Sequence, residues 1–336
     1  MKKIIFISLG LALLTSCAAQ KPGAHIQKYI NTITAEELKT HLTIVASDEM
    51  EGRETGSAGQ KKAGEYLIKQ YKADGIPAAD GAEGYYQKVP AAFMNSQFGE
   101  QLPDSENICA FIKGSEKPDE IVVISAHYDH VGVKNGKVYN GADDDGSGTV
   151  ALLEIAQAFE IAKKNGNGPK RSVLILHVTG EEHGLHGSRF YSENPLYPLK
   201  NTVADVNIDM IGRRDDLHPN TNDYVYLIGS DYLSTDLYTI CEEANKKYIN
   251  TDIDYKYNSK KDPNRFYYRS DHYNFAKNGI PSVFIFNGTH ADYHKATDKV
   301  EKIEFDALAK RTRLAFAIAW EIANRDNKLI VDKTDD

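Results

Sequence analysis

The sequence has 336 residues, enough for one large domain or two small ones with a sizeable core. Apolar residues make up 41% and charged residues 26%, which is ordinary for a soluble globular protein and excludes a fibrous or disordered chain. The formal net charge is -8 and there is no basic run, so we expect no nucleic-acid partner.

The first element of the chain is a targeting segment. Two lysines precede the apolar run Ile4–Leu14, which is too short to span a membrane comfortably. The run ends in Leu-Thr-Ser-Cys, which resembles a bacterial lipobox, although an ordinary signal peptide with a chance cysteine is the alternative. We therefore expect a lipoprotein signal peptide over 1–16, a lipid on Cys17 and a tether over 17–33. The protein is then expected in the cell envelope, anchored in the outer membrane and facing the periplasm.

The rest of the chain predicts helices that alternate with strands. Thr34-Ala35-Glu36-Glu37 has the spacing of a capping box and predicts a helix that runs to about Ala46. The other predicted helices are 57–73, 148–164, 232–248, 272–277 and 304–324, and the predicted strands are 85–91, 107–113, 121–126, 172–178, 203–210, 224–228, 253–257 and 282–286. Several strands are almost wholly apolar, so we expect one α/β domain over 34–330, with a largely parallel sheet covered on both faces.

Cys109 and Cys241 are the remaining cysteines. They could form a disulfide in an oxidising envelope. Their spacing fits neither a disulfide framework nor a metal motif, so we favour two separate buried thiols.

Histidines and acids follow the ends of several predicted strands. In open α/β sheets, functional groups gather where the strands end at their carboxyl edge. The residues in these positions are His127, Asp129, Asp143, Asp144, Asp145, Glu181, Glu182, Asp209 and His294. Crowded carboxylates repel one another, and a divalent cation would explain their assembly.

The stretch from His127 to Gly148 is the densest part of this pattern. His127 and Asp129 face the same side of an extended chain, so Asp129 is well placed to accept a hydrogen bond from a metal-bound His127. The following acids lie in a glycine-flanked turn before a helix. A calcium loop of the EF-hand type is excluded because Leu152 stands where a glutamate is required. The remaining alternative is a helix cap with solvated acids.

Glu181 and Glu182 are adjacent, so on extended chain one can bind a metal while the other faces its bound water. The sequence contains no HExxH, HxxEH, GxSxG, phosphate-loop or dinucleotide-loop motif. We expect the nearby His177, His183 and His186 to be structural or to support the ligands.

Six ordered motifs resemble the M28 family of zinc aminopeptidases: AHYDH, GADDDGSG, TGEEHGLHGS, NIDMIG, YRSDHYNFAKNGIP and YHKATD. The resemblance covers roughly residues 35–325. It implies a three-layer α/β/α domain of the zinc-exopeptidase type, with a mixed, largely parallel sheet and two zinc ions per chain. Asp144 would bridge the two ions, and its peptide bond to Asp145 would be cis. The implied ligands are His127, Asp144, Glu182, Asp209 and His294.

The same resemblance implies an aminopeptidase that releases N-terminal residues from peptide substrates. Glu181 would be the general base, Asp129 would orient His127, and Tyr267 would help to stabilise the oxyanion. Met210, Phe284 and Phe286 fall where relatives line the first specificity pocket, although they could equally be core residues.

Three other functions remain open. Arg213 or Arg214 could hold a substrate carboxylate, as in a carboxypeptidase or dipeptidase, although a solvated loop is the simpler interpretation. A related glutaminyl cyclase would use a single zinc ion, which the intact pair His127 and Asp209 disfavours. A peptide-binding lipoprotein without activity is the third alternative, and no ligand or base is missing that would indicate it.

Overall fold

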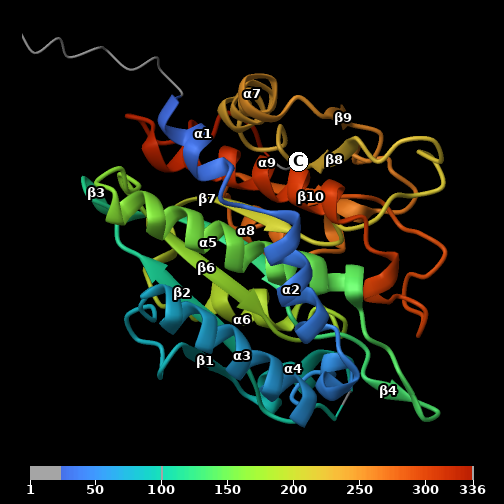
Figure 1. The fold of residues 1–336 in the computed structure, drawn as a ribbon. Coiled ribbons are helices and arrows are strands. Elements are labelled where there is room, and N and C mark those ends of the chain that lie inside the picture. The colour runs from blue at the N-terminus through green and yellow to red at the C-terminus, as the bar shows by residue number, and fades with distance from the viewer. Residues whose placement is uncertain (1–23, 100, 335–336) are drawn as a thin grey trace, which may run out of the picture.

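The computed structural model describes residues 24–99 and 101–334, and its centre is one eight-stranded sheet (Figure 1). The strand order is β1-β2-β6-β3-β7-β10-β8-β9. The strands are β1 Tyr86–Val89, β2 Ser105–Ile112, β3 Lys117–His127, β6 Arg171–Val178, β7 Thr202–Ile208, β8 Tyr224–Ile228, β9 Asp252–Asp254 and β10 Ser282–Phe286, with a separate hairpin of β4 Val133–Lys134 and β5 Lys137–Val138. The neighbours β6, β3, β7 and β10 are parallel, whereas β2 and β8 pair antiparallel with them. The expected mixed, largely parallel sheet is confirmed.

Helices cover both faces of the sheet, which gives the expected three layers. The helices α5 and α9 contact one face, and the shorter α6 and α8 contact the other (Figure 1). The helices are α1 Ala24–Ile30, α2 Ala35–Val45, α3 Ala58–Asp74, α4 Ala91–Phe98, α5 Gly148–Lys164, α6 His186–Glu193, α7 Thr235–Ala244, α8 His272–Ala276 and α9 Phe305–Asn324. None of the described helices is both long and apolar enough to cross a membrane.

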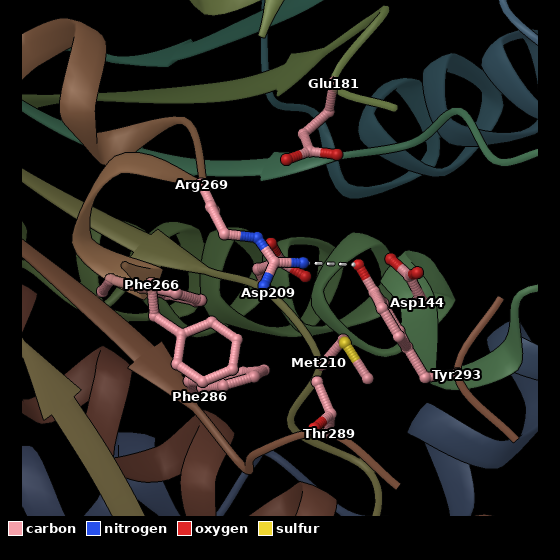
Figure 2. A pocket seen from close by; sticks show the side chains of 10 residues that line it. Asp144, Glu181, Asp209, Met210, Phe266, Arg269, Phe286, Thr289 and Tyr293 are labelled. Carbon is pink, nitrogen blue, oxygen red and sulfur yellow. Dashed lines mark hydrogen bonds between the residues drawn. The ribbon is translucent and has the colours of Figure 1, made fainter. Parts of the chain in front are cut away.

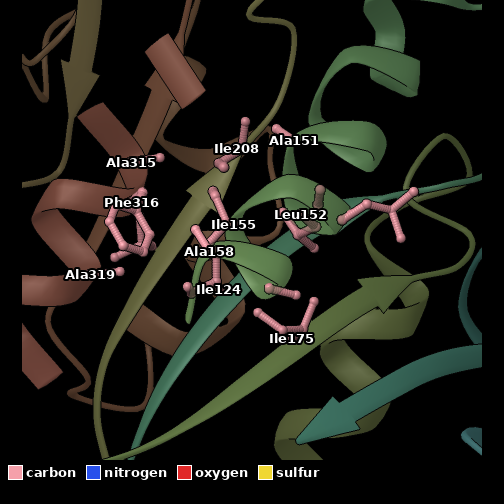
Figure 3. Packing of buried hydrophobic residues seen from close by; sticks show 14 of the residues in the cluster. Ile124, Ala151, Leu152, Ile155, Ala158, Ile175, Ile208, Ala315, Phe316 and Ala319 are labelled. Carbon is pink, nitrogen blue, oxygen red and sulfur yellow. The ribbon is translucent and has the colours of Figure 1, made fainter. Parts of the chain in front are cut away.

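The main core lies between the sheet and the helices α5 and α9 (Figure 3). Ile124 and Ile175 on neighbouring strands pack near Ile155 of α5 and Phe316 of α9, and all four are fully buried. Burying one such side chain contributes about 1.5–3 kcal/mol. This layer therefore fixes the parallel strands, and with them the loops at their carboxyl ends.

Local sequence signals set the ends of the first long helices. The Thr34 hydroxyl accepts a hydrogen bond from the Glu37 backbone N–H (3.1 Å), as the capping box predicts. Ser57 caps α3 in the same way, and α3 ends at Gly75, which has a left-handed φ of 78°. Both predicted helices are confirmed.

The predicted tether is wrong from Ala24 onward, because residues 24–30 form α1 and pack on α5 and α9. Ile26, Tyr29, Ile30 and Ile33 are all buried. They follow one another at helical spacing, which is the signal that the tether interpretation overlooked. The predicted signal peptide and Cys17 lie outside the described residues.

Other differences concern short elements. The helices α4 and α6 were not predicted, and the predicted helix over 232–248 begins later, since α7 covers Thr235–Ala244 and continues as a π-helical turn over Asn245–Ile249. Cys109 and Cys241 are both buried and unpaired, so the interpretation as separate thiols is confirmed.

Candidate metal centre

The predicted ligands converge because their strands are neighbours. His127 ends β3, Glu182 follows β6, Asp209 follows β7 and His294 follows β10. These four parallel strands are adjacent in the order β6-β3-β7-β10, so their carboxyl ends meet at one edge of the sheet. Asp144 joins them from the irregular turn Ala142–Ser147, which precedes α5.

Asp144 directs one oxygen toward each of two groups of ligand atoms. Its Oδ1 lies 3.3 Å from His127 Nε2, and that nitrogen lies 3.5 Å from Asp209 Oδ1. Its Oδ2 lies 3.1 Å from His294 Nε2, and that nitrogen lies 2.9 Å from Glu182 Oε2. The five side chains therefore form two groups that share one carboxylate.

These donors fit two divalent cations of the zinc type. Ligand atoms in a tetrahedral zinc site stand about 2.0–2.1 Å from the metal, which places them about 3.3 Å from one another. In the described part of the chain, His127 Nε2 and Asp144 Oδ2 are buried without a hydrogen-bond partner. Buried polar atoms normally have a partner, and a shared pair of cations would satisfy both.

Asp145 also lies within reach of His127 and Asp209. Its Oδ1, however, accepts hydrogen bonds from the backbone N–H groups of Gly148 (2.9 Å) and Met210 (3.0 Å). This carboxylate therefore joins the ligand turn to the end of β7. The peptide bond between Asp144 and Asp145 is cis, as the family resemblance implied.

His130 belongs to this centre, although the sequence analysis assigned it no role. The ring is fully buried, and its Nδ1 lies 2.6 Å from Glu182 Oε1. His130 therefore contacts one oxygen of the Glu182 carboxylate, and His294 contacts the other. The available signal was its position in the motif AHYDH, three residues after His127.

Arg53 is a second residue that sequence reasoning missed. Its guanidinium is fully buried and donates to four main-chain oxygens. The acceptors are Val45, Tyr128, Asn140 and Gly141, at 2.7–2.9 Å. Arg53 thus joins the loop after β3, which carries Asp129, to the turn that carries Asp144.

Glu181 stands beside the ligands and faces the cavity. Its Oε2 is 3.9 Å from His127 Nε2, and its backbone N–H donates to Asp129 Oδ1 (3.3 Å). Burial, opposed by His127 and reinforced by Asp209, raises the pKa of the Glu181 carboxyl well above its usual range. Its ionised form would therefore be stabilised strongly by positive charge placed beside it.

Asp129 is fully buried, and the Thr55 hydroxyl donates to its Oδ2 (2.9 Å). Its Oδ1 lies 3.7 Å from His127 Nδ1, whereas the main-chain oxygen of Asp129 is closer, at 3.1 Å. The nearest acceptor for the His127 ring is therefore the backbone of Asp129, and the carboxylate contacts the start of the Glu181 loop.

A small cavity opens beside the two ligand groups, with about 320 Å³ of empty space when the open solvent at its mouth is included (Figure 2). It is lined by Asp144, Glu181, Asp209, Met210, Phe266, Arg269, Phe284, Phe286, Thr289 and Tyr293. The three predicted pocket residues, Met210, Phe284 and Phe286, are all among them.

Tyr267, for which the family resemblance implied help to the oxyanion, is not among the residues that line the cavity. It is 2% exposed and packs in an aromatic cluster against Tyr232 and His272. Its neighbour Phe266 faces the cavity instead, because the short turn Phe266–Tyr268 directs successive side chains differently. The tyrosine that lines the cavity is Tyr293.

The two arginines considered for a substrate carboxylate lie elsewhere. Arg213 forms an ion pair with Asp292 (3.0 Å), and Arg214 forms one with Glu304 (3.0 Å). Both line a different surface hollow, so the structure does not bring them to the candidate metal centre.

Comparison with known structures agrees with the fold. The fold resembles the solved LapA aminopeptidase of Legionella pneumophila, with a TM-score of 0.70 at 21% identity over 97% of this chain and 81% of that one. It also resembles BSAP, a zinc aminopeptidase from Bacillus subtilis, with a TM-score of 0.64 at 16% identity over 88% of this chain and 96% of that one. These likenesses establish the fold of a zinc exopeptidase.

The sequence comparisons give the family. Residues 107–319 match the model of peptidase family M28, and the chain belongs to this family. The sequence is 29% identical over 316 residues to a probable leucine aminopeptidase of Trichophyton verrucosum, which covers 89% of this chain and 76% of that protein. It is 30% identical over 260 residues to leucine aminopeptidase 1 of Pyrenophora tritici-repentis, covering 71% of this chain and 65% of that protein.

Proposed function

We propose that this protein is a two-zinc aminopeptidase that removes the N-terminal residue from peptides. The observation that carries the proposal is the position of Asp144, whose two oxygens face two separate ligand groups. His127 and Asp209 would complete one zinc site, and Glu182 and His294 the other. A glutaminyl cyclase uses a single zinc ion, so it would not need His127 and Asp209 as ligands of a second ion.

The roles of the protein side chains follow from their positions. Zinc, when bound, supplies Lewis-acid polarisation of the scissile carbonyl and acidifies water. Glu181 accepts the proton of the attacking water at its carboxylate and then delivers it to the leaving amine. Asp129 holds the Glu181 loop through the Glu181 backbone N–H, and Thr55 fixes the Asp129 carboxylate in turn.

The cavity favours a free N-terminus. A protonated amine is attracted to the acids Asp144, Glu181 and Asp209, and a neutral amine is a metal ligand. The side chain of the first residue would enter the apolar part of the cavity, where Met210 and Phe286 lie (Figure 2). The cavity is small, so it suits one residue rather than the middle of a long chain.

The test compares peptides with free and acetylated N-termini on protein whose metal content is measured. We expect two zinc ions per chain, rapid cleavage of leucyl peptides, and loss of cleavage after acetylation. One zinc ion per chain together with cyclisation of N-terminal glutamine would favour the cyclase instead. Equal cleavage of the free and acetylated peptides would exclude an aminopeptidase.

We also propose that the mature protein is a lipoprotein of the cell envelope, attached through Cys17. The support is the sequence alone, namely the short apolar run that ends in Leu-Thr-Ser-Cys. Cys17 is followed by Ala18 and Ala19 and not by an acidic residue, so the outer membrane is the expected site of attachment.

A further inference from the structure

Arg269 is the only lysine or arginine among the described residues that line the cavity. It follows the short turn Phe266–Tyr268 and precedes α8. Figure 2 shows its guanidinium extending over the cavity toward Tyr293. Its side chain is exposed, so the positive charge is accessible to a ligand at the rim.

Two contacts from separate segments hold this guanidinium in place. Its Nη2 donates to the Tyr293 hydroxyl (3.2 Å), and its central carbon lies 5.1 Å from the centre of the Phe266 ring. Tyr293 in turn stacks on the ring of His294, at 3.9 Å between centroids. A planar guanidinium held by an aromatic face and a hydroxyl keeps further N–H donors for a ligand.

Arg269 also lacks the acidic partner that the nearby arginines have. Arg213 and Arg214 each form an ion pair at 3.0 Å, with Asp292 and Glu304 respectively. In the part of the chain that the structure describes, no carboxylate forms an ion pair with Arg269. Its guanidinium contacts the Tyr293 hydroxyl and an aromatic ring, and neither supplies a negative charge.

We propose that Arg269 binds a carboxylate of the peptide substrate and so favours substrates that carry one near the cleaved bond. This inference rests on the proposed aminopeptidase function. The first residue's side chain would occupy the apolar part of the cavity, whereas Arg269 is exposed at the rim. The carboxylate is therefore expected on the leaving side, as the free C-terminus of a short peptide. An acidic side chain on the first residue is the second source of the same chemistry.

The experiment measures kcat/KM for four peptides with wild-type protein, Arg269→Met and Arg265→Met. Leu-Gly and Leu-Gly amide differ only in the C-terminal carboxylate, while Glu-Gly amide and Gln-Gly amide differ only in a side-chain carboxylate. Arg265→Met is the matched control, because Arg265 is exposed on the same segment but does not line the cavity. Each result is a ratio within one variant, so partial loss of folded protein cancels.

We expect wild-type protein to have a higher kcat/KM for Leu-Gly than for Leu-Gly amide. Arg269→Met should lower the ratio of these two kcat/KM values roughly 10- to 100-fold, as for loss of a charged hydrogen bond. Arg265→Met should keep the wild-type ratio. Arg269→Met could instead lower the ratio of kcat/KM for Glu-Gly amide to that for Gln-Gly amide. That result also supports a carboxylate site and shows that Arg269 binds the side-chain carboxylate of the first residue. If both ratios are the same in wild type and Arg269→Met, the proposal is overturned. If wild-type protein cleaves none of the four peptides, the proposed function itself fails.

Discussion

The clearest test of an individual residue is Glu181→Gln. We expect kcat to fall by about 10²–10⁴-fold, since general acid-base catalysis contributes about that much. The zinc content should stay unchanged, because Glu181 belongs to neither of the two ligand groups. Glu193→Gln is the matched control on the exposed end of α6. Loss of zinc in Glu181→Gln, or near-normal turnover, would contradict the proposed role.

A second test at this scale concerns a histidine away from the metal centre. His177 is fully buried in β6, its Nε2 lies 2.5 Å from the Tyr71 hydroxyl, and burial lowers its pKa to about 3. The unfolded chain takes up a proton near pH 6.5 and the folded protein does not. His177 therefore favours the unfolded state increasingly as pH falls below 6.5, by about 1.4 kcal/mol per pH unit, until pH approaches 3.

Denaturation of wild type and His177→Gln between pH 7 and pH 4.5 checks this expectation. The free energy of unfolding should fall less steeply with decreasing pH in the variant. Identical slopes for the two proteins would show that His177 does not remain neutral in the folded state.

The sequence predicted which histidines and acids come together better than it predicted the side chains that hold them in place. His127, Glu182 and Asp209 each follow a predicted apolar strand, so the rule that parallel strands end at one edge was enough to bring them together. Arg53 binds main-chain oxygens of distant loops, and such contacts leave no periodic pattern in the sequence. In the same way, the sequence does not show which side chain of the short turn Phe266–Tyr268 faces the cavity, and the structure places Phe266 there.

At the scale of elements, the irregular turn before α5 depends on contacts from another segment of the chain. The turn Ala142–Ser147 carries Asp144, and Arg53 holds the residues just before it by donating to Asn140 and Gly141. We expect Arg53→Met to lower the free energy of unfolding by several kcal/mol, since each buried carbonyl left without a donor costs about 1–3 kcal/mol. Arg53→Lys should not restore stability, because a single ammonium cannot reach four separated oxygens.

Thermal or urea unfolding measures this effect. Arg214→Met is the control, since it removes a partly exposed arginine whose surface ion pair with Glu304 contributes about 0–1 kcal/mol. If Arg53→Lys proved as stable as wild type, the positive charge alone would be enough to hold the turn. The several N–H groups of the guanidinium would then not be needed.

Element prediction succeeded where periodicity was strong, and the helices that it missed, α1, α4 and α6, have at most 8 residues each. The helix α5 has the predicted bounds, because apolar residues recur along its length and it follows a glycine-flanked turn. The helix α1 has only 7 residues, and α6 has 8. Helices this short are marginal alone and are stabilised by packing, which a single sequence does not display.

For the whole molecule, metal binding and stability should be coupled. The buried acids of the metal centre repel one another, so removing divalent cations with a chelator should lower the melting temperature, and adding zinc should restore it. A ligand present at 100 times its dissociation constant stabilises the folded state by about 2.7 kcal/mol. Asp144→Ala should reduce the chelator effect more than Asp209→Ala, because Asp144 contacts both ligand groups. Equal effects in the two variants would argue against a shared carboxylate.

The proposed lipid anchor is tested on the complete chain. Cys17→Ser should move the protein from the membrane fraction to the soluble fraction or leave it unprocessed, because the acceptor for the lipid is gone. Cys109→Ser provides the comparison, since that thiol is buried in the core. Membrane fractionation that is unchanged by Cys17→Ser would exclude this mode of attachment.

If the proposed lipid anchor is present, the position of α1 gives the molecule a direction relative to the membrane. Tyr29 of α1 stacks on Trp320 and accepts a hydrogen bond from Asn167, just before β6 begins, so α1 lies at the amino edge of the sheet. The cavity opens at the carboxyl edge, and the 11 residues of β3 between these edges span about 36 Å. A lipid upstream of α1 would hold the cavity well away from the bilayer and turn it toward the surrounding fluid. Peptides dissolved in the compartment would reach it freely, whereas chain ends lying against the lipid surface would stay out of reach.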